Sequence, residues 1–125
     1  MRGCIGTVEP EKSTLAQEVI INAVKAATRD PRFEPITYDE LPSLRYSVDV
    51  LGRLEPVAFE DLNPSVFGVV VTDYSGLRRG LLLPAIESIR TAGQQVSVAA
   101  RKAGVEAGEP LKLYRFRTHR FSERV

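Results

Sequence analysis

Residues 66–83 read VFGVVVTDYSGLRRGLLL, two apolar runs separated by a short segment of turn-forming residues. The first run, residues 66–72, is almost continuously apolar, and the second resumes at Leu77 after Asp73-Tyr74-Ser75-Gly76. This arrangement is typical of a β-hairpin whose strands are buried in a sheet. The sequence therefore predicts that residues 66–83 supply two central strands.

A helix is predicted on the N-terminal side of the hairpin. Ser13 or Thr14 can cap its first turn, and Gln17 stands at the capping-box position for Thr14. Helical spacing relates the apolar residues Leu15, Ala16, Val19, Ile20, Ala23, Val24 and Ala27. Asp30-Pro31 ends the helix, because the residue before a proline disfavours helical geometry.

Three further strands are predicted at residues 2–8, 45–51 and 111–121, and two short helices between Pro84 and Gly104. This order lacks the regular βα alternation of doubly wound folds. The expected fold class is α+β, with a mostly antiparallel sheet of about five strands packed against helices. No repeat or low-complexity linker divides residues 1–125, so one compact domain is predicted.

Composition narrows the classes of protein that the chain can belong to. The 125 residues carry a net charge of +1, which gives no reason to expect avid binding to nucleic acid or to an anionic membrane. The single cysteine cannot form an intramolecular disulfide. No segment has the ~20 apolar residues of a transmembrane helix, and residues 1–12 lack the apolar stretch of a signal peptide. The expected location is cytoplasmic.

The segment Arg2-Gly3-Cys4-Ile5-Gly6 concentrates features that make a cysteine reactive. A nearby cation favours the thiolate, which gives Arg2 a role as a stabiliser of the Cys4 thiolate or of a bound anion. Gly3 and Gly6 leave room for a ligand to approach the backbone. The alternative is a small cysteine buried in a core strand, where most free cysteines are inert.

The only histidine, His119, is the candidate general base for a Cys4 nucleophile. Its alternative role is that of a solvent-facing residue on a basic edge strand. One cysteine and one histidine fall short of the four ligands of a structural zinc site, so no metal is predicted. The sequence names no cofactor.

The C-terminal segment from Lys112 to Arg124 mixes basic and aromatic side chains. Its members are Lys112, Tyr114, Arg115, Phe116, Arg117, Arg120, Phe121 and Arg124. Such a strand could bind phosphates and stack bases, as in nucleotide or RNA recognition. Charged residues on an edge strand also suppress edge-to-edge aggregation, so a protective role explains the same residues.

Several short motifs, in a fixed order, give the chain a resemblance to a known family. RGCIGT at residues 2–7 is followed by DPRFEP at residues 30–35 and by Glu40-Leu41. SVDVL at residues 47–51, GLLLP at residues 80–84 and KAG at residues 102–104 agree with the later family pattern. Over nearly its whole length the chain resembles the AMMECR domain family, in the bacterial form known as AmmeMemoRadiSam system protein A.

The resemblance implies a compact cytoplasmic α+β domain whose motif cysteine has been suggested to be enzymatic, without settled chemistry. It also implies partners, namely a Memo-like protein and a radical S-adenosylmethionine protein. The residues that match the family motifs are Arg2, Gly3, Cys4, Gly6, Asp30, Arg32, Phe33 and Glu40. Family members carry a substantial segment before the cysteine motif, which begins here at residue 2, so we expect either a clipped start or an abbreviated fold.

Three functions remain open at this level. In the first, Cys4 forms the centre of an active or ligand-binding site, with Arg2 and His119 as its catalytic helpers. The residues around the ligand would then be Gly3, Gly6, Asp30, Arg32, Phe33 and Glu40. In the second, the domain is a non-enzymatic adaptor for the Memo-like and radical S-adenosylmethionine proteins. In the third, the basic C-terminal strand binds a nucleotide or RNA.

Overall fold

The computed structural model of the chain describes residues 1–123, which form two compact units. The first unit comprises residues 1–48 and 121–123, and the second comprises Asp49–Arg120. Helices and antiparallel sheets build these units, which confirms the α+β class. The expectation of one domain over residues 1–125 stays a prediction.

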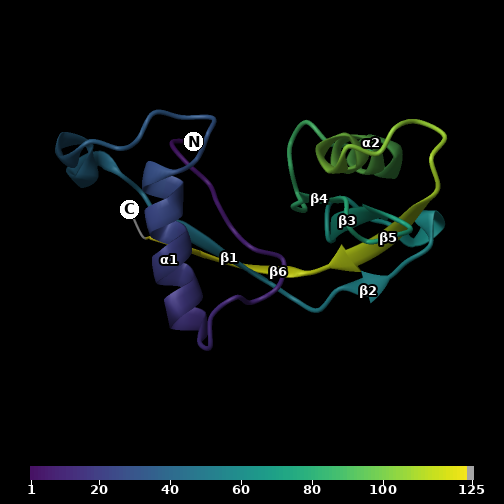
Figure 1. Ribbon diagram of the computed structural model, residues 1–125, viewed down its shortest axis with the longest axis horizontal. Helices are drawn as coiled ribbons and strands as arrows, with labels where there is room; N and C mark the ends of the chain where they lie inside the picture. The colour runs from purple at the N-terminus through teal and green to yellow at the C-terminus, as the bar shows by residue number, and fades with distance from the viewer. Residues whose placement is uncertain (124–125) are drawn as a thin grey trace. The chain divides into compact units, whose positions relative to one another are not determined.

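The second unit is built on a four-stranded antiparallel sheet in the order β2-β5-β3-β4. Its strands are β2 (Glu55–Pro56), β3 (Gly68–Asp73), β4 (Arg79–Leu82) and β5 (Leu111–Phe116). Helix α2 (Ala92–Ala103) packs against β3 and β4, and Figure 1 shows it lying over one face of the sheet. A short 3₁₀ helix, η2 (Phe59–Asp61), lies between β2 and β3.

The predicted hairpin is confirmed, with Val69 opposite Leu82 and Thr72 opposite Arg79. Its turn is stabilised by the Asp73 carboxylate, which accepts hydrogen bonds from the Ser75 hydroxyl at 2.7 Å and from the Gly76 amide at 2.9 Å. Of the two hairpin strands, β3 lies inside the sheet and β4 lies at its edge. The prediction of two central strands is therefore wrong for β4.

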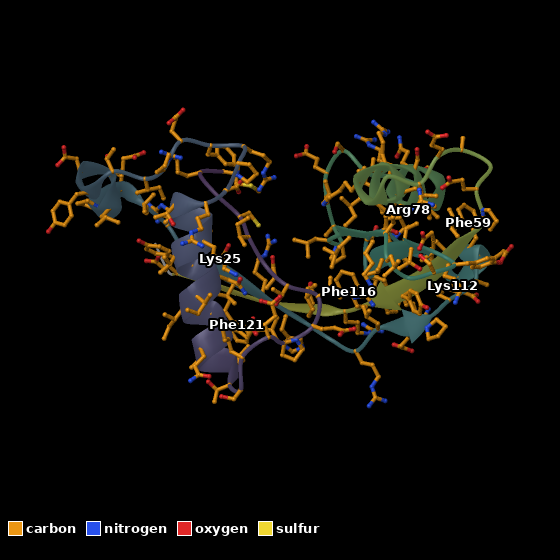
Figure 2. All side chains as sticks on the ribbon, viewed as in Figure 1. Lys25, Phe59, Arg78, Lys112, Phe116 and Phe121 are labelled. Atoms are coloured by element: carbon orange, nitrogen blue, oxygen red, sulfur yellow. The ribbon has the colours of Figure 1, made fainter. Side chains whose placement is uncertain are left out.

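The core of the second unit lies between α2 and the sheet. Val69, Val71, Leu82 and Ala99 form its buried apolar cluster. Gly80 makes this packing possible, since a Cβ at that position would collide with the carbonyl oxygen of Ala99. Figure 2 shows Arg78 just below α2, where its guanidinium donates to the carbonyl of Gly104 at 2.8 Å. The hairpin and the end of the helix are thus tied together.

Helix α2 corresponds to the second of the two predicted helices. Its start is a capping box between Thr91 and Gln94, and its end is Gly104, which adopts the left-handed conformation expected of a C-cap. Residues 84–91 form no helix, so the first of the two predicted helices is absent. Ala85 has a positive φ of 59° and its amide donates to the carbonyl of Pro64, which takes that backbone out of helical geometry.

The first unit contains α1 (Leu15–Thr28) and a six-residue 3₁₀ helix, η1 (Tyr38–Ser43). Thr14 caps α1 as predicted, accepting a hydrogen bond from the Gln17 amide. None of the α1 residues is fully buried, and several of its apolar side chains are exposed. Leu15, Ile20 and Val24 are 59%, 61% and 57% exposed.

Two of the predicted strands differ in the structure. Residues 2–8 form no strand, because side chains rather than a neighbouring strand hold this backbone, as described below. The predicted C-terminal strand is two strands, β5 and β6 (Thr118–Ser122), which break at Arg117 and join different sheets. Strand β6 pairs with β1 (Ser47–Leu51), the strand predicted at residues 45–51.

Candidate functional site

The segment that carries Cys4 is fixed at two points in the first unit. The first point is Arg2, whose guanidinium donates to both carboxylate oxygens of Glu40, at 2.9 and 3.2 Å. The same guanidinium donates to the carbonyl of Glu34 at 2.7 Å. Arg2 therefore clamps residues 2–6 to the segment 34–40, and its charge is directed to Glu40.

Glu40 joins this clamp to the start of η1. Its carboxylate accepts a hydrogen bond from the Thr37 amide at 2.8 Å, which completes a capping box. The hydrogen bond from Arg2 and then that from Thr37 lower the pKa of Glu40 from 4.5 to about 2. Glu40 thus stays ionised and acts as a fixed anchor.

The second point is Asp30, which is 4% exposed. One carboxylate oxygen accepts a hydrogen bond from the backbone amide of Cys4 at 2.9 Å. Arg32 pairs with both oxygens, at 3.0 and 2.8 Å. These bonds, with Arg32 first and Cys4 second, hold the pKa of Asp30 far below its ordinary value. A buried carboxylate paired in this way organises the backbone around it.

Arg32 lies beside the cysteine itself. Its guanidinium donates to the backbone carbonyl of Cys4 at 3.1 Å. The pKa of Arg32 is raised, chiefly by the hydrogen bond to Asp30, and the Cys4 side chain contributes to the same direction. The cation next to the thiol is therefore Arg32, whereas the sequence pattern pointed to Arg2.

Cys4 is exposed, so the interpretation of a cysteine buried in a core strand is wrong. The physical reason is that this segment lies as an irregular chain on the surface of the first unit, with its amide bonded to Asp30. An exposed thiol on a backbone fixed by two polar contacts, one to Asp30 and one to Arg32, is accessible to a reagent or ligand.

The two glycines of the motif differ in their surroundings. A Cβ on Gly3 would collide with the carbonyl of Ala26, so Gly3 lets the motif lie directly on α1. A Cβ on Gly6 would meet no atom within 4 Å. Gly3 therefore serves packing, and only Gly6 leaves open space near Cys4.

Phe33 and His119 complete the predicted set. Phe33 is half-buried, with the Arg32 guanidinium 5.4 Å from its ring centroid. His119 is an exposed residue of β6 in the second unit, and its pairing with Cys4 stays a prediction. The structure thus joins Arg2 to Glu40, and Cys4 to Asp30 and Arg32, in two hydrogen-bonded groups of the first unit.

The basic C-terminal segment is distributed over two strands. Arg120 pairs with Asp49 at 2.8 Å, Lys112 lies over the ring of Tyr74, and Arg115 and Arg117 both lie against Phe67. Figure 2 shows Lys112 on the sheet of the second unit. Arg124 lies outside the described residues. The contacts of Phe67 could not be predicted from the sequence, because an aromatic residue near the head of an apolar run gives no sign of two arginines that are distant in sequence.

Within residues 1–123, no three side chains of the metal-ligating types cluster closely enough to hold an ion. In the same residues, no helix has both the length and the apolar character needed to cross a bilayer.

Sequence and structure comparisons place the chain among known proteins. The profile of the AMMECR1 family matches residues 1–122. A Thermotoga maritima protein is 46% identical over 123 residues, which cover 97% of this chain and 70% of that protein. Clostridium acetobutylicum protein CA_C1420 is 40% identical over 98% of this chain and 26% of its own length. The crystal structure of uncharacterized protein PH0010 from Pyrococcus horikoshii matches with a TM-score of 0.87 and 29% identity, covering 98% of this chain and 65% of that one.

Proposed function

Since the chain belongs to the AMMECR1 family, we propose that it carries the cysteine-centred site of its RGCIG motif, with Cys4 as a nucleophile or ligand-binding thiol. The observation that carries the proposal is the exposed Cys4, whose backbone carbonyl accepts a hydrogen bond from the Arg32 guanidinium at 3.1 Å. Asp30 accepts hydrogen bonds from both the Cys4 amide and the Arg32 guanidinium, so it fixes the position of Arg32 relative to the Cys4 backbone. Such preorganisation distinguishes a site from a cysteine on a loose surface segment.

Arg32 also indicates which ligands suit this site. A guanidinium attracts anionic groups and binds planar carboxylates or phosphates through two parallel hydrogen bonds. Its side chain is 57% exposed, so donors remain available beyond those that Asp30 and the Cys4 carbonyl occupy. The proposed substrate class is therefore an electrophile or disulfide that bears a negative charge close to the reacting atom.

Paired alkylating reagents test this site directly. Iodoacetate carries a negative charge and iodoacetamide does not, so the ratio of their rates with Cys4 reports a cation at the thiol, independently of the fraction of thiolate. We expect the folded protein to show a higher ratio than the unfolded protein, measured by intact-mass spectrometry. Arg32→Gln should lower this ratio about several-fold.

Arg45→Gln is the matched control for that experiment. It removes the same charge from an exposed position of the first unit outside the cysteine motif. The ratio should therefore stay near that of the wild-type protein in Arg45→Gln. An unreactive Cys4 in the folded protein, or equal ratios in the folded and unfolded chains, would contradict the proposed site.

A second candidate function, that of an adaptor for Memo-like and radical S-adenosylmethionine proteins, is favoured by exposed apolar side chains on α1. Ile20 and Val24 lie one turn apart on α1 and are 61% and 57% exposed, and protein partners commonly cover such patches. Ile20→Asp should abolish retention of a Memo-like protein in co-purification while leaving the alkylation ratio of Cys4 unchanged. The α1 surface would be rejected if the Ile20→Asp variant still retained the Memo-like protein, or if the wild-type protein did not retain it.

A further inference from the structure

Two arginines of the second unit converge on one aromatic ring. The guanidinium carbons of Arg115 and Arg117 lie 4.4 and 4.7 Å from the ring centroid of Phe67. Both distances are within the ~6 Å of a cation–π contact, and together they place the two guanidinium carbons within about 9 Å of each other. We refer to Phe67, Arg115 and Arg117 as the Phe67 cluster.

Backbone contacts hold both arginines in place. Arg115 lies on β5, between Val69 of β3 and Glu55 of β2, and its guanidinium donates to the carbonyl of Asp61 at 3.3 Å. Arg117 follows the end of β5, where its carbonyl accepts a hydrogen bond from the Gly52 amide at 2.7 Å. The cluster is therefore built on the sheet and its flanking loop backbone.

The charges of the Phe67 cluster are not balanced. Among residues 1–123, no carboxylate pairs with Arg115 or Arg117, although Glu55 stands opposite Arg115 in the strand register. The Nε of Arg115 is buried and has no hydrogen-bond partner. A buried donor without an acceptor is costly, and in native proteins it commonly marks a bound water or ion.

We propose that the Phe67 cluster binds a phosphate monoester group. Two guanidinium groups carry two positive charges, which a phosphate monoester dianion balances and a carboxylate does not. Guanidinium groups bind phosphate oxygens through paired hydrogen bonds, and the ring of Phe67 keeps both groups oriented. The cluster lies in the second unit, so the proposal stands independently of the Cys4 site in the first unit.

The test is a titration of the full chain with inorganic phosphate, followed by ¹H–¹⁵N spectra at constant ionic strength. We expect saturable shifts centred on residues 67 and 115–117. Arg117→Gln should weaken phosphate binding about tenfold. Arg53→Gln is the matched control, because Arg53 is an exposed arginine of the same unit outside the cluster, and it should bind phosphate as the wild-type protein does.

Two further ligands distinguish the sources of the phosphate group. AMP that binds more tightly than inorganic phosphate, at the same residues, supports the proposal and identifies a nucleotide. A short RNA without terminal phosphates offers only diesters, and RNA binding that inorganic phosphate and AMP do not displace would overturn the proposal. Shifts that fail to saturate, or that persist unchanged in Arg117→Gln, would overturn it as well. Arg117→Lys retains the charge and serves as the second variant should Arg117→Gln fail to fold.

Discussion

The backbone amide of Cys4 donates to the carboxylate of Asp30 at 2.9 Å, across 26 residues of sequence. Asp30 lies two residues beyond α1, so this single bond attaches the cysteine motif to the end of the helix. The orientation of the thiol therefore depends on a residue that performs no chemistry itself. Asp30 is best regarded as a positioning residue.

Replacing Asp30 by Asn should release the cysteine motif. The amide side chain of Asn removes the charge that Arg32 neutralises, and it replaces one acceptor oxygen by a donor group. We expect a lower Tm and faster amide exchange at Cys4, measured by hydrogen–deuterium exchange. Unchanged protection at Cys4 in Asp30→Asn would show that the hydrogen bond does not hold the segment.

Gly3→Ala and Gly6→Ala form a matched pair. A Cβ at residue 3 meets the carbonyl of Ala26, and overpacking of this kind costs about 1–3 kcal/mol. A Cβ at residue 6 meets no atom within 4 Å. Urea denaturation should therefore give a lower midpoint for Gly3→Ala and a nearly unchanged midpoint for Gly6→Ala. Equal midpoints for the two variants would contradict the close approach of the motif to α1.

Stability should fall in acid through Glu40. Its pKa is lowered to about 2 in the folded chain from 4.5, so between these values the unfolded chain binds more protons than the folded chain. The stabilisation by Glu40 is then fully present above about pH 4.5 and is lost as the pH falls towards about 2. Glu40→Gln should flatten the dependence of Tm on pH in this range. A Tm profile identical to that of the wild-type protein would exclude this contribution.

Thr91→Ala should weaken the start of α2. Thr91 and Gln94 satisfy each other's backbone amides, and loss of such a cap costs about 1 kcal/mol. Ser97→Ala, at an exposed position within the same helix, should change the free energy of unfolding little or raise it slightly. Chemical denaturation of both variants checks this difference, and a Thr91→Ala protein as stable as Ser97→Ala would contradict it.

The sequence correctly predicted the helix caps and the turn, because each of these features is determined by residues within a few positions of one another. The Thr14 cap, the Asp73–Gly76 turn and the Gly104 C-cap depend on neighbouring backbone atoms, and all three are confirmed. The edge position of β4 depends instead on which strands pair, which is settled by contacts between residues far apart in sequence.

In the candidate site, too, the residues could be predicted from local motifs, whereas their contacts with distant residues could not. Short motifs identified Arg2, Asp30 and Glu40, but their partners stand 26 and 38 residues away, so the pattern could not assign their roles. The pairing of Arg2 with Glu40 left Arg32 as the cation beside Cys4. The segment 2–8 was expected to be a strand because its residues suit one, whereas ion pairs hold it in irregular form.

The absence of buried residues on α1 has a consequence for the order in which amides open. Every buried hydrophobic side chain among residues 1–123 belongs to the second unit, where Val69, Val71 and Phe116 are wholly enclosed. Local opening is least costly where few apolar contacts are lost. The amides of α1 should therefore exchange with solvent through local fluctuations, whereas those of β3 should exchange only through global unfolding. Hydrogen exchange in the two units should then proceed at two distinct sets of rates.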